Sequence, residues 1–274
     1  MTRHCYRSVF ALLALVLFCA PSVPAFAQSA EDDDARLRPL EPDFKIINLP
    51  TTLPLPVHGG NFELTHRFAG NWNRDFSDVM ADFFGTDEGA TINIGYRFGL
   101  FKHVELAASR TNFDRTIEIQ GKYDAFHEEQ GHPVGLSAVV SVEGGNNFSR
   151  DFEPALGASV SRTLGTAAIV YADPFWVHNS GLFTGTTHNT GFIGVGGRLR
   201  LRPGMFVVGE VSPRVAGYDP GDMLYGFGVE WRVGGHVFQL NWSNSTGGAT
   251  YGQIARGGSP NSLFFGFNLE RKFY

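Results

Sequence analysis

Residues 223–233 have the sequence MLYGFGVEWRV, which alternates large apolar side chains with small or charged ones. Successive side chains of a β-strand point to opposite faces, so this stretch predicts a strand with one apolar and one polar face. The apolar face carries Tyr225, Phe227, Val229 and Trp231, and the other face carries Gly226, Gly228, Glu230 and Arg232. Such a strand suits the wall of a membrane barrel, which has lipid outside and a polar interior.

The same two-residue period recurs from Gly59 to Phe273. It predicts strands at 62–68, 90–98, 104–109, 117–123, 134–142, 153–163, 166–173, 189–201, 205–213, 223–233, 236–245 and 262–273. Bacterial barrels have an even number of tilted strands of about ten residues. The fold we expect over 59–274 is therefore all-β, a transmembrane antiparallel up-and-down β-barrel of about twelve strands.

The connections between these strands support the same architecture. Long connections are expected at 70–88, 143–152, 174–188, 214–222 and 246–261. Tight turns are expected at Leu100-Phe101, Leu164-Gly165, Arg202-Pro203-Gly204 and Gly234-Gly235. Outer-membrane barrels alternate long extracellular loops with short periplasmic turns in this way. A short turn near Asn112 and a longer connection around 125–133 depart from the alternation.

Residues 1–27 have the features of a secretory signal peptide. Arg3 and Arg7 precede an apolar run at 9–20, and Ala25-Phe26-Ala27 forms a small-x-small cleavage pattern. The mature chain would then begin at residue 28, outside the cytoplasm.

Cysteine usage and charge limit the function of the mature chain. Cys5 and Cys19 both fall within the signal, which excludes disulfides and Cys-ligated metals from the mature chain. Removing the signal leaves 20 basic residues against 27 acidic ones, a net charge of −7. A general nucleic-acid-binding protein should instead be basic. No later apolar run reaches the roughly 18 residues that a transmembrane helix needs.

Residues 28–58 form a proline-rich extension ahead of the barrel. The segment opens with the acidic run 31–34 and then carries five prolines. Proline removes backbone donors, so an extended and mostly unpaired conformation is expected. We favour a periplasmic linker, and the alternative is an arm that enters the barrel and plugs it.

The charged residues of the polar faces are expected to line the lumen. They are Glu63, Arg67, Arg97, Glu105, Glu118, Lys122, Arg198, Arg200, Glu230, Arg232, Glu270 and Lys272. Because the set contains both positive and negative side chains, we expect either salt bridges that fill much of the interior or a narrow polar pore lined by these residues. Barrels of about eight strands are filled by side chains and those of about sixteen hold channels, so a barrel of about twelve leaves both alternatives open.

Several stretches resemble an uncharacterised bacterial outer-membrane β-barrel family, which is a domain of unknown function. They are Lys45-Ile46-Ile47-Asn48, 59–68, Phe83-Phe84-Gly85, 90–95, 238–245 and 265–271. The resemblance implies an outer-membrane barrel and brings no catalytic residues. Barrels of this membrane commonly end in an aromatic residue that the barrel-assembly machinery recognises. Phe273 is in the outward register here, and Tyr274 follows it.

Three short patterns invite a chemical interpretation. The sequence 127–132, HEEQGH, has its histidines five apart instead of the four that a zinc protease helix requires, so we expect a polar turn. Glycines at 191, 194, 196 and 197 precede a continuing strand, which favours close packing over a nucleotide loop. His66, His103, His178, His188 and His236 have no spacing that predicts a catalytic trio.

The first long connection has apolar residues at helical spacing. They are Phe76, Val79, Met80 and Phe83, and Asp75 or Ser77 can cap a short helix there. We favour a lid packed on the rim of the barrel, and the alternative is a gate or a ligand contact.

We expect a protein of the Gram-negative cell outer membrane, porin-like in function, acting as a channel or transporter for small polar solutes. The expected partners are outer-membrane lipid, the barrel-assembly machinery through the C-terminal strand, and a small polar solute, without nucleic acid. We assign no catalytic, cofactor-binding or metal-binding residue. The alternatives are a membrane-embedded hydrolase or lipid-modifying enzyme that uses rim histidines, a structural or adhesive barrel with partner-binding loops, and a soluble secreted β-sandwich.

Overall fold

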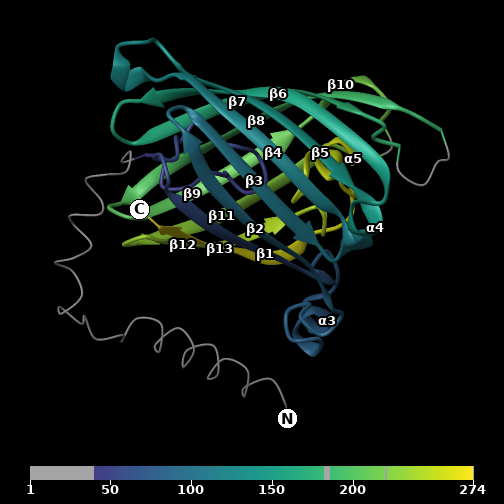
Figure 1. The fold of residues 1–274 in the computed structure, drawn as a ribbon. Coiled ribbons are helices and arrows are strands. Elements are labelled where there is room, and N and C mark those ends of the chain that lie inside the picture. Colours follow the sequence, from purple (N-terminus) through teal and green to yellow (C-terminus); the bar gives the residue numbers. More distant parts are fainter. Residues whose placement is uncertain (1–39, 182–185, 220, 274) are drawn as a thin grey trace.

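The computed structural model describes residues 40–181, 186–219 and 221–273, and its strands form one closed antiparallel barrel (Figure 1). The signal peptide expected at 1–27 and the first part of the proline-rich extension lie outside the described residues. The strands are β1 (Gly60–Asn71), β2 (Ala90–Phe101), β3 (Val104–Thr111), β4 (Ile117–Phe126), β5 (Gly135–Gly144), β6 (Arg150–Leu164), β7 (Ala168–His178), β8 (Asn189–Arg202), β9 (Met205–Ser212), β10 (Arg214–Gly217), β11 (Leu224–Val233), β12 (His236–Ser243) and β13 (Phe264–Phe273).

The barrel closes at the seam between its first and last strands. β1 pairs with β13 from Gly60↔Phe273 inward, and each other strand pairs with its neighbours along the chain. β10 continues the line of β9 beyond Pro213 and pairs, like β9, with β8. Counting β9 and β10 as one wall strand gives twelve, so the predicted architecture and strand number are confirmed.

Several predicted boundaries differ from those of the structure, and two of the differences are instructive. The connection expected at 214–222 begins with strand β10, and β7 runs on to His178 instead of ending at 173. The second error has a physical reason. All the buried inward residues of β7 except Asp173 are apolar, which hides the two-residue alternation that marks the other strands.

The two ends of the barrel differ in their connections. The terminal end holds both ends of the wall, the tight turns and the short 3-10 helix η3 (Glu128–Gln130). The loop end holds the helices α3 (Phe76–Ala81), α4 (Gly145–Phe148) and α5 (Tyr251–Arg256) and the 3-10 helix η2 (Phe113–Arg115). Among the described residues, no helix has the length and apolar character needed to cross a membrane.

The outer face of the wall is a continuous apolar surface. Outward side chains such as Ile94, Leu156 and Leu199 are about half exposed, at 52%, 57% and 49%. Monomeric soluble proteins rarely expose apolar patches of more than a few hundred Å². A lipid environment accounts for this surface, and a soluble β-sandwich, which buries its apolar faces, does not.

Three arginines on the outer face of the wall lie near the strand ends. Arg110 donates to Asn147 at the loop end, Arg162 forms an ion pair with Glu128 at the terminal end, and Arg271 contacts His236 there. Positions near the interface let a guanidinium reach water or headgroups at a cost of only about 0–1 kcal/mol.

The helix predicted in the first long connection is present as α3, but it is not a lid. Asp75 is its N-cap residue, without a side-chain capping hydrogen bond. Figure 1 shows α3 projecting beyond the wall, and Phe76 and Phe83 are 60% and 69% exposed while only Val79 of the predicted apolar set is buried. Val79 is thus covered, and the rest of the predicted apolar face is left exposed.

Candidate functional site: a lumen closed from both ends

The interior of the barrel is filled by two segments of the chain. Residues 40–55, which we call the arm, enter at the terminal end and are buried within the ring of strands (Figure 1). The connection 246–261, with α5, folds into the loop end, and Tyr251, Ile254 and Ala255 are buried. The favoured linker interpretation therefore does not describe residues 40–55, and 246–261 is not a freely extended loop.

The lumen has two chemically different walls. Seven inward residues of β7, β8 and β9 are apolar and form one core cluster with the arm and α5: Ile169, Tyr171, Phe175, Val177, Phe192, Phe206 and Val208. The charged Asp173, Arg198 and Glu210 lie on the same strands. Inward residues of β1–β4, β12 and β13 are largely polar or charged. An amphipathic filling is needed to satisfy both walls, because buried polar groups need partners and apolar groups need contact.

The deepest part of the arm is a tight reverse turn. Ile46 N–H donates to Leu49 O at 2.8 Å, and Thr51 N–H donates to Phe44 O at 3.0 Å. Lys45 and Pro50 form an antiparallel bridge on either side of the turn. The chain thus enters, reverses inside the barrel and returns to the terminal end, where β1 begins.

The Glu210 carboxylate of β9 binds this turn through its backbone. It accepts hydrogen bonds from the amides of Ile47, Asn48 and Leu49 at 3.0–3.1 Å. The Asn48 side chain adds a fourth donor at 2.8 Å. Consecutive N–H groups of a turn form a concave anion site, and a buried carboxylate fills it here.

Wall residues on three other strands bind the carbonyl groups of the same turn. Gln239 Nε2 donates to Ile46 O at 2.6 Å, and Asn268 Nδ2 donates to Ile47 O at 2.9 Å. Arg198 donates to Lys45 O and forms a buried ion pair with Glu230 at 3.0 Å. The wall therefore satisfies both the donors and the acceptors of the turn.

Glycines in the wall make room for the aliphatic side chains of the turn. A Cβ atom at Gly194 would lie 2.5 Å from Leu49 Cδ2, and one at Gly196 would lie 2.6 Å from Ile46 Cδ1. A Cβ at Gly226 would lie 3.2 Å from Ile47 Cδ1. The interpretation of the glycines at 191–197 as a close-packing feature is thus confirmed at 194 and 196.

Cations of the polar wall surround the base of the arm. The Phe44 ring lies 5.4 Å from the Arg97 guanidinium and 5.7 Å from each of the Lys122 and Lys272 ammonium groups. These lysines also donate to arm carbonyls, at Leu53 and Pro42 respectively. Cation–π attraction is strengthened where the cation is desolvated, as it is here.

Three carboxylates hold the loop-end segment. Tyr251 N–H donates to Glu118 at 3.4 Å, and Gly252 N–H donates to Glu143 at 3.2 Å. Arg256 forms ion pairs with Glu153 at 2.6 Å and with Glu143 at 3.4 Å. The Tyr251 ring stacks on Phe175 of the apolar wall at 4.3 Å.

The two segments meet in the middle of the barrel. Lys45 Nζ donates to Ala249 O at 3.5 Å, and it also pairs with Glu63. A Cβ at Gly248 would lie 3.1 Å from the Asn48 side chain. The arm and the loop-end segment therefore contact each other as well as the wall.

The residues predicted to line the lumen take inward positions in the strands. Ten of the twelve are buried, and Arg200 and Arg232 are half-buried. They do not form one site. Arg97 pairs with Glu105, Arg198 with Glu230, and Glu118 binds α5, while Arg67 donates to Asn268 and Asn48. Their role as lumen-lining selectivity residues stays a prediction.

The residues that sequence reasoning missed are those that bind the arm and α5. They are Glu210, Gln239, Asn268, Glu143, Glu153 and Arg256, together with the apolar wall. One signal was present. Residues 166–173 carry small or apolar residues on both faces, which indicates a strand whose inner face also meets an apolar surface.

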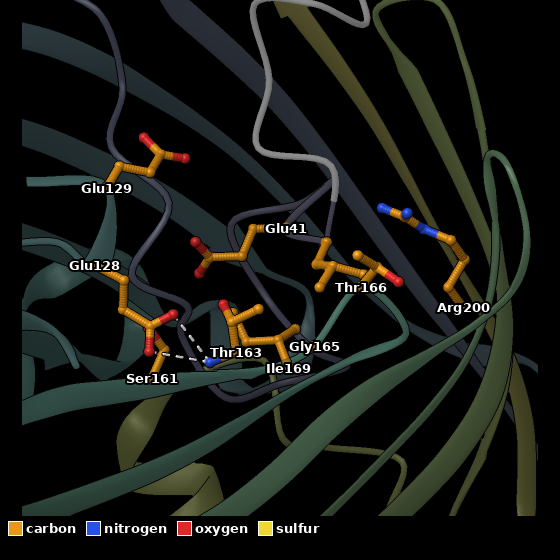
Figure 2. Close-up of a pocket in the computed structure, with 10 residues that line it drawn as sticks. Glu41, Glu128, Glu129, Ser161, Thr163, Gly165, Thr166, Ile169 and Arg200 are labelled. Carbon is orange, nitrogen blue, oxygen red and sulfur yellow. Dashed lines mark hydrogen bonds between the residues drawn. The ribbon is translucent and has the colours of Figure 1, made fainter. Parts of the chain in front are cut away.

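A pocket of about 430 Å³ lies where the arm enters the terminal end (Figure 2). Leu40 and Glu41 of the arm line it, with Glu128, Glu129 and Arg200 from the wall and turns. Glu128 accepts from Thr163 N–H at 3.1 Å, as the dashed lines show. Water can therefore reach the base of the arm along one side.

The remaining sequence motifs have structural placements. Residues 127–132 lie in the η3 turn, as expected. His66 stacks on Phe267 on the outer face, His178 contacts Asn189, and His188 stacks on Tyr218 at the loop end. Within the described ranges, no group of three potential ligands is placed to hold a metal ion.

Comparison with solved structures gives several low-identity likenesses. The outer membrane protein Omp33 of Acinetobacter baumannii is 10% identical, with 79% of this chain and 98% of that chain covered and a TM-score of 0.44. The NanC porin is 5% identical, with 78% and 99% covered and a TM-score of 0.49. The COG4313 outer membrane channel from Pseudomonas putida F1 is 12% identical, with 80% and 97% covered and a TM-score of 0.47.

No curated protein sequence matches this chain. A family model described as "Membrane bound beta barrel domain (DUF5777)" matches residues 43–273. The match begins in the arm and ends at the last residue of β13, so it includes the plugged lumen as well as the wall. The chain therefore belongs to this family of membrane-bound β-barrels of unknown function.

Proposed function

We propose that this protein is a gated outer-membrane channel for small polar solutes. In the state described here, the arm and the segment 246–261 keep the channel closed. The observation that carries the proposal is that these two segments, and not the wall residues alone, fill the lumen. Each is attached to the wall through one or two short connections, so each can move without breaking the barrel.

The location in the outer membrane belongs to the same proposal. Support comes from the apolar outer face, the membrane-bound family and the signal peptide expected at 1–27. The proposed partners are outer-membrane lipid and the barrel-assembly machinery. The latter would bind the C-terminal strand, where Phe273 is outward-facing and 47% exposed.

We infer a non-enzymatic protein. The histidines considered for rim catalysis lie on separate elements, and several have aromatic or amide partners of their own. Replacing each of the five histidines by alanine should leave conductance unchanged. Loss of a lipid-modifying or hydrolytic activity in any of these variants would contradict the inference.

A disulfide between arm and wall tests the gate directly. Thr52 of the arm and Ser161 of β6 have hydroxyl oxygens 2.6 Å apart, and both side chains are buried. The mature chain has no cysteine, so Thr52→Cys with Ser161→Cys gives one defined cross-link. We expect openings of the oxidised protein in planar bilayers to be about tenfold rarer or absent, and reduction to restore them.

A matched pair controls for the chemistry. Ser180 and Thr190 have hydroxyl oxygens 2.7 Å apart and lie away from the arm. Their double cysteine variant should conduct equally when oxidised and reduced. The channel proposal is rejected if the native protein shows no conductance and no solute uptake in any redox state.

A second candidate function is partner binding by the first long loop. It is favoured by α3, which projects beyond the wall and exposes Phe76 and Met80, and by the exposed Phe83 that follows it. Protease trimming of 76–83 on intact cells should abolish partner binding and leave conductance intact. Unchanged binding after trimming would reject this candidate.

A further inference from the structure

Inward residues of the wall contact residues 44–51 as a binding site contacts a peptide ligand. We propose that the barrel contains a binding site for a short bent peptide, which the arm occupies in the closed state and which a separate peptide of the same chemistry can occupy instead. This proposal deepens the proposed channel function, on which it rests, by naming short peptides as the solute class.

The first argument is that the wall recognises backbone groups. Glu210 accepts from three consecutive amides, and Gln239, Asn268 and Arg198 donate to three successive carbonyls, at residues 46, 47 and 45. Any peptide has these groups in this order. Backbone contacts of this kind bind a peptide whether or not it is covalently joined to β1.

The second argument is that the wall also selects side chains. The wall leaves space beside three glycines, Gly194, Gly196 and Gly226, and these spaces hold the side chains of Leu49, Ile46 and Ile47, respectively. A Cβ atom at any of these glycines would crowd the aliphatic side chain beside it. Asn48 points to polar partners, Glu210 and Arg67. The site therefore fits a four-residue turn that is aliphatic at its first, second and fourth positions and small and polar at its third.

The third argument is the cost of burying Glu210 under a ligand that supplies no hydrogen-bond donors. The hydrogen bonds to the Glu210 carboxylate come from residues 47–49, and the side chain is only 4% exposed with the arm in place. A buried carboxylate without donors is strongly unfavourable. A ligand that takes the place of the arm buries this carboxylate again, so it must supply both amide donors and aliphatic groups, which a sugar or an inorganic ion does not do.

A nicked barrel provides the test. Val57 lies in the exposed stretch between the arm and β1, at 47% exposure, so a site-specific protease sequence is inserted between Val57 and His58. The folded full chain is then cleaved, and a labelled synthetic peptide with the sequence of residues 40–57 is added in excess. We expect one labelled peptide per barrel, measured by native mass spectrometry, with loss of the original arm.

Variants of the peptide and of the barrel measure the specificity of the binding site. A peptide carrying Ile46→Asp and Leu49→Asp should show at least about tenfold less uptake, because two charges would replace the aliphatic groups in their seats. A nicked Glu210→Ala barrel should show a similar loss with the native peptide. Asp82→Ala removes a carboxylate that accepts Gly85 N–H outside the lumen, and its uptake should equal that of the unaltered barrel.

A second variant covers the case in which the nicked protein fails to stay folded. The uncut chain carrying Ile46→Asp in its own arm should bind the native peptide at least about tenfold more tightly than the unaltered chain, since its own arm competes less well. Equal uptake of native and aspartate-containing peptides, or no uptake by the nicked barrel and by this variant, overturns the proposal.

The outcome separates the peptide site from the channel. Peptide uptake by a protein without conductance would keep the site and reject the channel. Conductance that appears on reducing the Thr52–Ser161 cross-link and is not blocked by the native peptide would keep the channel and reject peptides as its ligands.

Discussion

Glu210 is the residue on which the position of the arm depends most directly, because three consecutive arm amides donate to it. Glu210→Ala leaves these donors buried without an acceptor. Hydrogen bonds to charged groups contribute about 1.5–3 kcal/mol each, and 1.4 kcal/mol corresponds to a tenfold change in an equilibrium. We expect amide hydrogen exchange at residues 47–49 to accelerate by about tenfold or more.

The control is again Asp82→Ala, which removes a carboxylate from a backbone amide in the first loop. Exchange at residues 47–49 should not change in this variant. If exchange at these residues were as slow in the Glu210→Ala protein as in the native one, the other contacts of the arm would suffice to hold it.

Gly194 gives a second prediction at this scale. Gly194→Ala places a Cβ within 2.5 Å of Leu49, so the turn must shift or leave its seat. We expect the arm to become sensitive to protease in this variant, and Leu49→Ala in the same chain to restore protection. Gly121→Ala is the matched control, because its Cβ would meet side chains only at ordinary contact distance, 3.5 Å or more.

At the level of elements, Arg256 fixes the segment that enters from the loop end. It pairs with both Glu153 and Glu143, which are buried. Removing one partner of a buried ion pair costs about 3–5 kcal/mol. Arg256→Met should therefore release 246–261, seen as faster hydrogen exchange over that range and more frequent channel openings.

Arg74→Met is the comparison for this variant. Arg74 also pairs with two carboxylates, Asp82 and Glu88, but on the exposed first loop, where such pairs contribute little. In the Arg74→Met protein, hydrogen exchange at residues 246–261 and channel conductance should match those of the native protein. An Arg256→Met protein that behaves in the same way would exclude 246–261 as a gate.

The strands of the wall could be predicted from the sequence far better than the two segments that fill the lumen. Alternation in a stretch such as 223–233 depends only on local residue order, and lipid outside with polar groups inside imposes it on almost every strand. Glu210 has the same inward register as the predicted residues, yet its function depends on the arm, more than 160 residues earlier in the chain. No local pattern encodes that contact.

The favoured linker interpretation does not describe residues 40–55, for a related reason. Proline fixes φ and removes backbone donors, which usually indicates an exposed, loosely ordered chain. Here wall side chains supply the partners that the arm lacks, such as Lys122 at Leu53 O and Gln239 at Ile46 O. Side chains of the surrounding wall thus provide the hydrogen-bond partners of the arm backbone.

For the whole molecule, stability in the membrane depends on an uninterrupted apolar exterior. Val195 lies in the middle of β8 and faces outward, at 46% exposure. Val195→Arg should cost about 2–4 kcal/mol, whereas Leu201→Arg near the strand end should cost about 0–1 kcal/mol. Equilibrium unfolding from lipid bilayers measures both values. Similar costs at the two positions would contradict the placement of β8 across the bilayer.

The seam between β1 and β13 joins residues that are about 200 positions apart, such as Arg67 and Gly266. Closing so long a loop of chain has an entropic cost. The arm precedes β1 and binds β12 and β13 through Gln239 and Asn268. The arm can therefore bring the two ends of the wall together before β1 and β13 form their hydrogen bonds. The segment that fills the finished barrel then also guides its assembly.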